Sequence, residues 1–340
     1  MKIDLYTPTG WINVPAIAAR PTWLKVIIGA RQVGKTYGTL KYMLDNDRQF
    51  ILMRRTTEEL KFIASNGELD PFTKFAPEYH TMIKGAGGSY SICDYDDDGI
   101  IPGSQRGVAL SLPIVSHIRG FDGSRFTDIV FDEFIPEKGV IVRKTEGDSL
   151  LNAYTTISGN RELEGCPPLT LWLLANTNNI NSPILDALGL TDDIIKMRSR
   201  GREYIEHDGI SIFQGRSQAI TDARRQTVLA RRVDPDSSFA QMAYNNEWAY
   251  DDSPVIKARS LRGLTPLCSF GKDMFYWEDS ASIYCCSSPH KVEHYNDNDF
   301  EREQFVANYR WLLPWYVEKM VTFSDIKLLA RFKRLFGIDY

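Results

Sequence analysis

The sequence predicts an α/β protein built on a parallel sheet, and three observations support this. Short continuous apolar runs at 23–28 (WLKVII), 128–131 (DIVF) and 170–175 (TLWLLA) are typical of strands buried on both faces. Segments of helical character, such as 56–65 (TTEELKFIAS), alternate with these runs. A glycine-containing turn directly follows the first run and leads into a helix-like segment, which is typical of α/β folds that bind phosphate.

The composition is that of an ordinary globular chain. Of its 340 residues, 43% are hydrophobic and 25% are charged, which excludes a disordered chain. No apolar run approaches the ~18 residues of a membrane span, and the N-terminus does not read as a secretory signal. Five cysteines predict a reducing compartment rather than a disulfide framework. With a net charge of −4, any contact with nucleic acid must come from local basic patches.

We expect three parts along the chain. Residues 1–197 contain the strand and helix patterns of an α/β domain. Residues 198–233 read as a linker or small helical subdomain, with eight arginines against four acidic residues over 198–232. Residues 234–340 predict a small C-terminal α/β domain, with aromatic strand-like runs at 274–277 and 282–286 and two helix-like segments over 301–336.

Several further elements can be placed in the first part. Residues 49–53 (QFILM) predict a strand that Arg54 and Arg55 stop, and Thr56 or Thr57 is the expected N-cap of the following helix. Residues 90–101 predict a hairpin with its turn at Asp98–Gly99.

One motif predicts a nucleotide site. The segment GARQVGKT fits G-x-x-x-x-G-K-[ST], whose backbone N–H groups wrap a phosphate at a helix N-terminus. Lys35 is expected to reach the β- and γ-phosphates and Thr36 to ligate Mg²⁺, so the predicted ligands are ATP and Mg²⁺. The alternative is a glycine-containing turn that binds no nucleotide. The expected nucleotide-binding residues are Gly29, Ala30, Arg31, Gln32, Val33, Gly34, Lys35, Thr36 and Tyr37.

Two later strand ends carry the remaining chemistry. Asp132 ends an apolar strand and is expected to hold the metal, while Glu133 is suited to deprotonating an attacking water. Asn176, just past another strand, is a candidate sensor of the γ-phosphate or of the water. The alternatives are a surface acidic pair and a plain strand-to-loop turn, in which asparagine is common.

The motifs in this order resemble the encapsidation ATPases of small protein-primed podophages, which are terminase-like P-loop ATPases of the additional-strand class. The resemblance rests on VIIGARQVGKTY, QFILMRRTTEEL, IVFDEFIPEK, GNRE and ANTNNINSP, and covers about 23–183 well. It continues more weakly through ARRQTVLARRVD and FSDIKLLARFKRLF.

The resemblance implies a motor ATPase that drives double-stranded viral DNA into a procapsid. It implies a homopentameric ring on the procapsid portal. A structural RNA mediates docking in some relatives, and the sequence leaves this open here. The expected location is the host cytoplasm and, transiently, the procapsid. The protein is not expected to be a stable virion component or to bind a membrane.

Specific roles follow from the same resemblance. Arg31 is expected to contact the γ-phosphate or restrain Glu133, and Asn176 matches the sensor asparagine. An arginine acting on the neighbouring subunit's ATP is expected at Arg119 or Arg161, although Gly159 stands where the family's RNRE element has its first arginine.

Basic residues after Asp132 are the expected DNA contacts. These are Lys138, which matches a pore-loop lysine of the family, together with Arg143 and Lys144; a solvated charged loop is the alternative. A second basic patch at Arg224, Arg225, Arg231 and Arg232 is suited to nucleic acid, to a neighbouring subunit or simply to solvent.

For the C-terminal domain the resemblance implies a vestigial RNase H-like fold that does not cut DNA. The region holds Asp273, Asp279, Asp297 and Asp299, but it is too short for the two-metal nuclease of large terminases and its acids do not match that nuclease's motif. The remaining alternatives for the whole chain are a P-loop kinase, a DNA helicase or translocase acting outside capsids, and a nucleic-acid-binding protein that does not hydrolyse ATP.

Overall fold

The computed structural model describes most of the chain and divides it into two compact units. The units are Met1–Ala249 and Tyr250–Tyr340. The described residues are 3–64, 70–74, 81–115, 122–136, 140, 142–177, 182–215, 217–234, 240, 243, 258–278, 282–287, 292–317 and 320–338.

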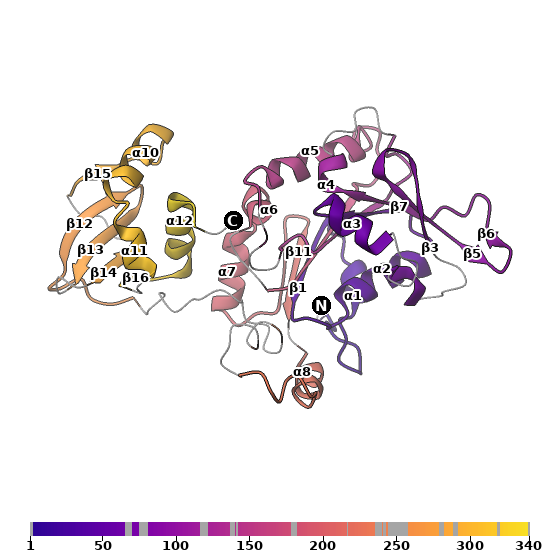
Figure 1. Ribbon diagram of the computed structural model, residues 1–340, viewed down its shortest axis with the longest axis horizontal. Coiled ribbons are helices and arrows are strands. Elements are labelled where there is room, and N and C mark those ends of the chain that lie inside the picture. The colour runs from indigo at the N-terminus through magenta and orange to yellow at the C-terminus, as the bar shows by residue number, and fades with distance from the viewer. Residues whose placement is uncertain are drawn as a thin grey trace. The chain divides into compact units, whose positions relative to one another are not determined.

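A single large sheet organises the first unit (Figure 1). Its central strands are parallel, and antiparallel strands lie at both edges. In spatial order the described strands are β10 (Tyr204–His207), β11 (Ile210–Gly215), β1 (Leu24–Gly29), β9 (Thr170–Ala175), β8 (Asp128–Asp132), β2 (Phe50–Arg54), β7 (Gly107–Ser111), β4 (Tyr90–Cys93) and β3 (Thr81–Lys84).

The strand order confirms the predicted additional-strand class. Strand β9 is hydrogen-bonded between β1 and β8, so the strand that precedes the glycine-containing turn and the strand that ends in Asp132 are not neighbours. Because the strands from β11 to β7 are parallel, their carboxyl ends meet at one edge of the sheet. That edge is where α/β folds bind ligands.

Helices cover both faces of this sheet, and Figure 1 shows α1 and α2 on one side of the strands and α6 and α7 on the other. Ile27, Val130 and Trp172 project from one face into a core with Leu40 and Met43 of α2. The described helices of the first unit are α1 (Val14–Ala18), α2 (Lys35–Asp45), α3 (Thr57–Ala64), α4 (Leu112–Val115), α5 (Glu146–Ser158), α6 (Pro183–Ala187), α7 (Thr191–Ser199) and α8 (Gln218–Arg225), with short 3₁₀ turns η2 (Pro71–Lys74) and η3 (Ala86–Gly88).

The helix cap at Thr56 and the turn before Gly99 agree with the sequence predictions to within one residue. Thr56 and Glu59 form a reciprocal capping box at the start of α3: the Thr56 hydroxyl accepts from the Glu59 amide at 3.1 Å and the Glu59 carboxylate accepts from the Thr56 amide at 3.4 Å. The predicted hairpin near Gly99 is formed by β5 (Tyr95–Asp96) and β6 (Gly99–Ile100), and its turn is one residue earlier than predicted.

The expected linker at 198–233 differs from the structure. Strands β10 and β11 both belong to the large sheet, and the first unit extends to Ala249 rather than ending at residue 197. Strand β10 is an edge strand and is only half-buried, so its polar composition resembles a linker. Among the described residues of this region, α8 and the last residues of α7 (Thr191–Ser199) are helical, and a turn follows α8.

The second unit confirms the predicted C-terminal sheet domain. Its described strands run in the order β15 (His294–Tyr295), β12 (Thr265–Phe270), β13 (Asp273–Glu278), β14 (Ser282–Cys286) and β16 (Val321–Phe323). Three helices accompany them rather than two, because β16 separates the last pair: α10 (Asp299–Asn308), α11 (Leu312–Val317) and α12 (Ile326–Phe336). Its core is rich in aromatic rings, including Phe275, Phe305 and Phe332.

No helix among the described residues is long and apolar enough to cross a membrane.

Candidate ATPase site

The phosphate-binding turn lies at the carboxyl end of β1. Gln32 has φ 58° and Gly34 has φ 92°, and α2 begins at Lys35. When left-handed and right-handed residues alternate, successive backbone N–H groups point into the same concavity, and this concavity binds anions. Gly34 is required for a second reason, because a Cβ on it would lie 3.3 Å from the ring of Trp11. The turn and the helix N-terminus therefore form an anion site.

Lys35 is held inside this turn. Its Nζ donates to the carbonyl oxygens of Gly29 and Ala30 at 2.9 and 2.7 Å and to Oδ1 of Asn176 at 2.8 Å. The side chain is 8% exposed, and burial lowers the pKa of Lys35 to about 7, partly opposed by the charges of Asp132 and Glu133. Lys35 is therefore placed so that phosphate oxygens could replace the backbone carbonyls as its hydrogen-bond acceptors.

Thr36, at the start of α2, lies against Asp132, at the end of β8. The Thr36 hydroxyl donates to Oδ1 of Asp132 at 2.9 Å, and Asp132 is buried at the end of β8. One hydroxyl and one carboxylate are a suitable protein ligand set for Mg²⁺, which keeps several waters and binds substrate phosphates. The residues present therefore fit a magnesium ion, with Thr36 and Asp132 as its ligands.

Glu133 is turned away from the strand. It has φ 57°, a left-handed conformation that is uncommon outside glycine and is found at functional sites, and its side chain is 58% exposed. Its amide donates to Oδ1 of Asp132 at 3.1 Å. The exposed carboxylate therefore lies beside the metal-binding pair, where it can accept a proton from water.

Arg54 joins the two carboxylates, and the sequence analysis missed this role. Its guanidinium lies 3.2 Å from Oδ2 of Asp132 and 3.2 Å from Oε2 of Glu133. Met53 pairs with Phe131 in the sheet, so the next residues, Arg54 and Asp132, are neighbours at the sheet edge. The pair of arginines after β2 was a visible signal, but its meaning depended on β2 lying beside β8.

Arg55 points to the loop after Asp132 instead. Its Nε lies 3.1 Å from Oε2 of Glu146, at the start of α5, and both side chains are buried. Oε1 of Glu146 accepts from the amide of Arg143 at 3.1 Å. Arg54 and Arg55 thus attach the carboxylates of Asp132 and Glu133 and the predicted DNA-contacting loop to the same strand end.

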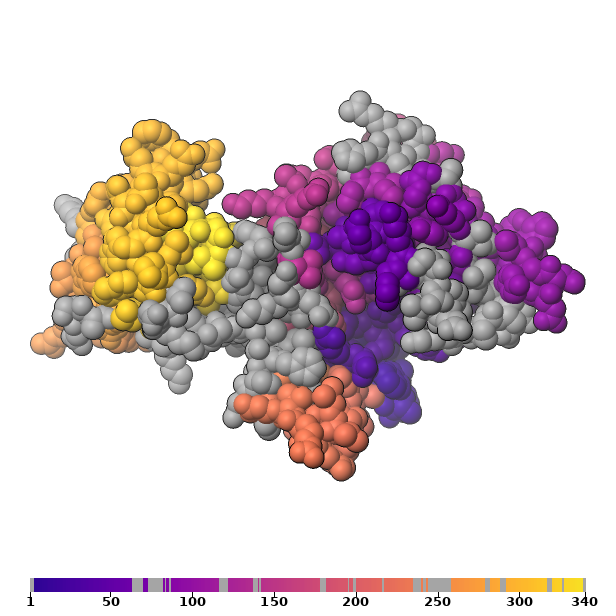
Figure 2. All heavy atoms as spheres, viewed as in Figure 1, coloured from indigo at the N-terminus to yellow at the C-terminus, as the bar shows by residue number. Residues whose placement is uncertain are grey.

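Arg224 does not stand free in the basic patch. Its Nη1 donates to the carbonyl of Arg31 at 2.5 Å and to the carbonyl of Ala243 at 2.7 Å. Figure 2 shows α8 and the turn after it as a protrusion of the first unit, where Arg225, Arg231 and Arg232 are exposed. Of the four patch arginines, Arg224 is therefore the one that the structure brings to the phosphate-binding turn.

Removing this contact is expected to weaken ATP binding. In Arg224→Ala we expect the KM for ATP to rise about tenfold with a smaller change in kcat, because two hydrogen bonds of ~1 kcal/mol each are lost, one to the Arg31 carbonyl in the phosphate-binding turn and one to the Ala243 carbonyl. Steady-state ATPase assays measure both constants. Arg225→Ala, one residue along the same helix, is the matched control, and an equal rise in KM there would contradict the role of Arg224.

Some predicted residues are not brought to this site. The side chain of Arg161 donates from Nη1 to the carbonyl of Phe126 at 2.8 Å, within its own subunit. Arg143 and Lys144 are exposed just before α5. Arg119 and Lys138 lie outside the described residues. Within the nucleotide-binding segment, Ala30 and Val33 are buried, whereas Tyr37 is 48% exposed on α2.

Comparisons with known proteins agree with this fold. A chain from "The bacteriophage Phi-29 viral genome packaging motor assembly" is similar over 96% of this chain and 99% of its own length, with a TM-score of 0.62 and 17% identity. A chain from "The Phi-28 gp11 DNA packaging Motor" is similar over 100% of both chains, with a TM-score of 0.54 and 15% identity. At these identities the likeness is one of fold. Among curated proteins no sequence matches the chain significantly.

The family is established by sequence. The family model described as Podovirus DNA encapsidation protein (Gp16) matches residues 11–285, which is most of the chain. The resemblance found in the motifs is thereby confirmed, and the protein belongs to the podovirus DNA encapsidation family.

Proposed function

We propose that this protein is the motor ATPase that drives double-stranded viral DNA into a procapsid by Mg²⁺-dependent ATP hydrolysis. One observation carries the proposal: Lys35, the Thr36–Asp132 pair and Glu133 meet at the carboxyl edge of an additional-strand sheet in a member of a DNA encapsidation family.

Each residue has a distinct part in hydrolysis. Lys35 and the backbone of the phosphate-binding turn bind the β- and γ-phosphates, and Asn176, already bonded to Lys35, contacts the γ-phosphate side of the site. A magnesium ion on Thr36 and Asp132 would neutralise charge on the phosphates. Glu133 accepts the proton of the attacking water, and its ion pair with Arg54 must loosen for it to do so, because a paired carboxylate is a weaker base.

We further propose that the active form is a ring, a pentamer by its resemblance, docked on the procapsid portal. Arg119 and Arg161 are the candidates for neutralising phosphate charge on a neighbouring subunit. Lys138, Arg143 and Lys144 are the candidate DNA contacts. Arg143 and Lys144 are exposed, and lysine and arginine bind DNA phosphates without reading the sequence. The proposed location is the host cytoplasm and, transiently, the procapsid, with a structural RNA at the docking point left to experiment.

We propose that the second unit is nuclease-like in fold and does not cut DNA. Asp273 forms an ion pair with Arg331, with Nε 2.8 Å from Oδ2, and Asp297 and Asp299 pair with Arg302. These three acids are engaged by arginines rather than grouped for metals, and Asp279 lies outside the described residues. Supercoiled plasmid incubated with the protein and Mg²⁺ or Mn²⁺ is therefore expected to stay intact.

The proposal is tested by phosphate release from ATP across a range of protein concentrations, with and without double-stranded DNA. We expect the activity per subunit to rise with both, and steeply, because an arginine supplied in trans is worth about 10³–10⁵ in rate in other P-loop enzymes. Activity that is flat with respect to both would contradict a ring motor. Phosphate transfer to a nucleoside would support a kinase, and strand displacement on a forked duplex would support a helicase.

A further inference from the structure

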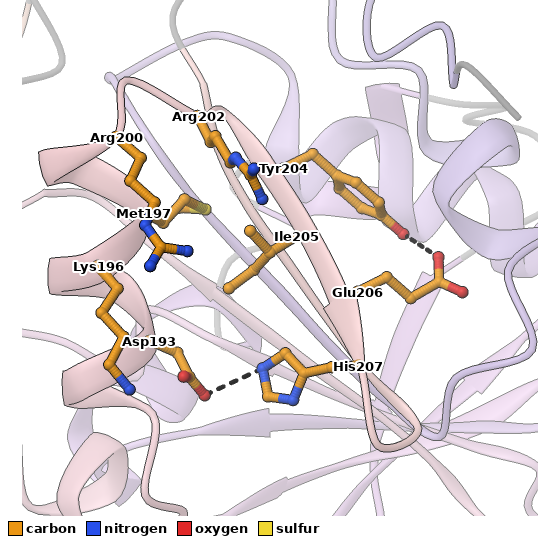
Figure 3. A pocket seen from close by; sticks show the side chains of 9 residues that line it. All are labelled: Asp193, Lys196, Met197, Arg200, Arg202, Tyr204, Ile205, Glu206 and His207. Atoms are coloured by element: carbon orange, nitrogen blue, oxygen red, sulfur yellow. Dashed lines mark hydrogen bonds and ion pairs between the residues drawn. The ribbon is translucent and has the colours of Figure 1, made fainter.

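A cavity of about 360 Å³ lies between α7 and the edge strand β10, away from the phosphate-binding turn (Figure 3). Strands β11 and β10 separate it from β1. Its walls carry three cations, Lys196, Arg200 and Arg202, together with Asp193, Glu206 and His207.

The acidic side chains of the cavity are already engaged. Oδ2 of Asp193 lies 3.1 Å from Nε2 of His207. Glu206 accepts from Arg20 at 2.6 and 3.0 Å and from the Tyr204 hydroxyl at 2.7 Å, and the contact with Arg20 lowers the pKa of Glu206. Glu206 is thus neutralised by Arg20, and neither carboxylate forms an ion pair with Arg200 or Arg202 among the described residues.

The arginines, in contrast, are available. Arg200 and Arg202 are exposed, and neither makes an ion pair with any residue that the structure describes. They flank Gly201, whose φ of 61° makes the tight turn at the end of α7, and the amide of Arg202 donates to the carbonyl of Met197 at 3.0 Å. Figure 3 shows both guanidinium groups over the space between helix and strand, so the turn presents two cations from a fixed backbone.

The arginines also lie at the functional edge of the sheet. Strand β10 is antiparallel to β11, and Tyr204 pairs with Phe213, close to Gly215, which is itself the partner of Gly29. Arg202, two residues before Tyr204, therefore lies toward the edge where β1 and β8 end. An anion bound there would lie toward the same edge of the sheet as the ATPase residues, with β11 between β10 and β1.

We infer that the exposed cations of this cavity bind the sugar–phosphate backbone of a nucleic acid. Guanidinium groups match phosphate geometry and hold it without reading sequence. The cations are exposed at the cavity rather than enclosed around one small anion. Such an arrangement suits a polyanion, which releases its counterions when it binds. The inference rests on the proposed function for the source of the ligand, which is either double-stranded DNA or a structured RNA, and both present the same chemistry.

The test uses the full-length double variant Arg200→Ala/Arg202→Ala and fluorescence anisotropy with a labelled DNA duplex and an RNA hairpin, each over a salt series. We expect affinity for one or both ligands to fall about tenfold or more, and the salt slope for duplex DNA to decrease by about 2, since each lost phosphate contact removes ~0.9. A loss confined to DNA or to RNA identifies the source. Arg200→Lys/Arg202→Lys keeps the charge and should retain most of the slope.

Two controls separate this result from a general loss of charge or of fold. Arg262→Ala/Arg310→Ala removes two exposed arginines of the second unit and should leave both binding curves unchanged. ATP turnover without nucleic acid should be unchanged in Arg200→Ala/Arg202→Ala, because neither arginine contacts the ATPase residues.

Wild-type affinity and slope for both nucleic acids in the alanine variant would overturn the inference. If self-association in sedimentation changed in the same variant, the cavity would instead be a contact between copies. If the wild-type protein bound nucleic acid through these arginines but hydrolysed no ATP, the motor proposal would fail and this inference would stand.

Discussion

Replacing Glu133 by glutamine is expected to lower ATP turnover by about 10²–10⁴-fold while leaving ATP binding intact, because glutamine cannot accept the proton of the attacking water. The side chain is 58% exposed and its amide contact with Asp132 is a backbone one, so the substitution leaves the metal-binding pair in place. Phosphate release in the presence of double-stranded DNA measures the loss, and equilibrium binding of a fluorescent ATP analogue measures the retained affinity.

A matched control is available in α3. Glu58→Gln makes the same chemical change at an exposed position and should leave turnover unchanged. If Glu133→Gln kept its turnover, another group would have to be the base. Loss of ATP binding in that variant would instead mean that Glu133 holds the site together through Arg54.

Replacing Lys35 by alanine is expected to have the second largest effect, a fall in turnover of about 10²–10³-fold, since one donor to the developing phosphate charge is lost. Weaker ATP binding should accompany it, because Lys35 is the cation held within the phosphate-binding turn by the carbonyls of Gly29 and Ala30. Lys25→Ala is not a useful control, since that lysine also bonds three buried groups. Lys41→Ala on the exposed side of α2 is the appropriate one.

The lowered pKa of Lys35 adds a pH dependence with a definite sign. Burial brings that pKa to about 7 in the nucleotide-free protein, and the phosphates of bound ATP raise it. Above pH 7 the free lysine is mostly neutral, so ATP binding takes up nearly one proton, and affinity falls by up to about tenfold per pH unit. Calorimetry at pH 8.5 in two buffers with different ionisation enthalpies measures this uptake.

Lys35→Arg is the informative comparison for that measurement. A guanidinium stays protonated throughout this range, so the variant should bind ATP without the buffer-dependent heat. Equal heats in both buffers for the wild-type protein would mean that Lys35 is already fully charged before ATP arrives.

Local patterns predicted much of the ATPase fold. The runs at 23–28, 128–131 and 170–175 became strands β1, β8 and β9 within one or two residues, because strands buried on both faces need continuous apolar sequence. The turn after β1 was predictable for the same kind of reason: it needs glycine at φ 92° and a helix starting at Lys35, and both are encoded within eight residues.

Contacts between residues far apart in the sequence were harder to predict from it. Arg54 was visible as the residue that stops β2, but its ion pairs depend on β2 lying beside β8, and strand order leaves no periodic signal. Arg224 was grouped with three other arginines by helical spacing, and only the fold brings it to a carbonyl 193 residues away. Strand β10 was assigned to a linker because an edge strand tolerates polar residues, and the buried strand β11 beside it was assigned to the linker as well.

The sequence alone therefore determined the fold class, the family and the residues whose roles depend on their immediate neighbours: Lys35 and Thr36 in the turn, and Asp132 and Glu133 at a strand end. Only the tertiary structure decided which distant cations reach that site. Apolar periodicity and turn chemistry act over a few residues, whereas the partner of a charged side chain is set by which strands and helices become neighbours when the sheet assembles. Arg54 and Arg224 acquire their contacts with the site at that step.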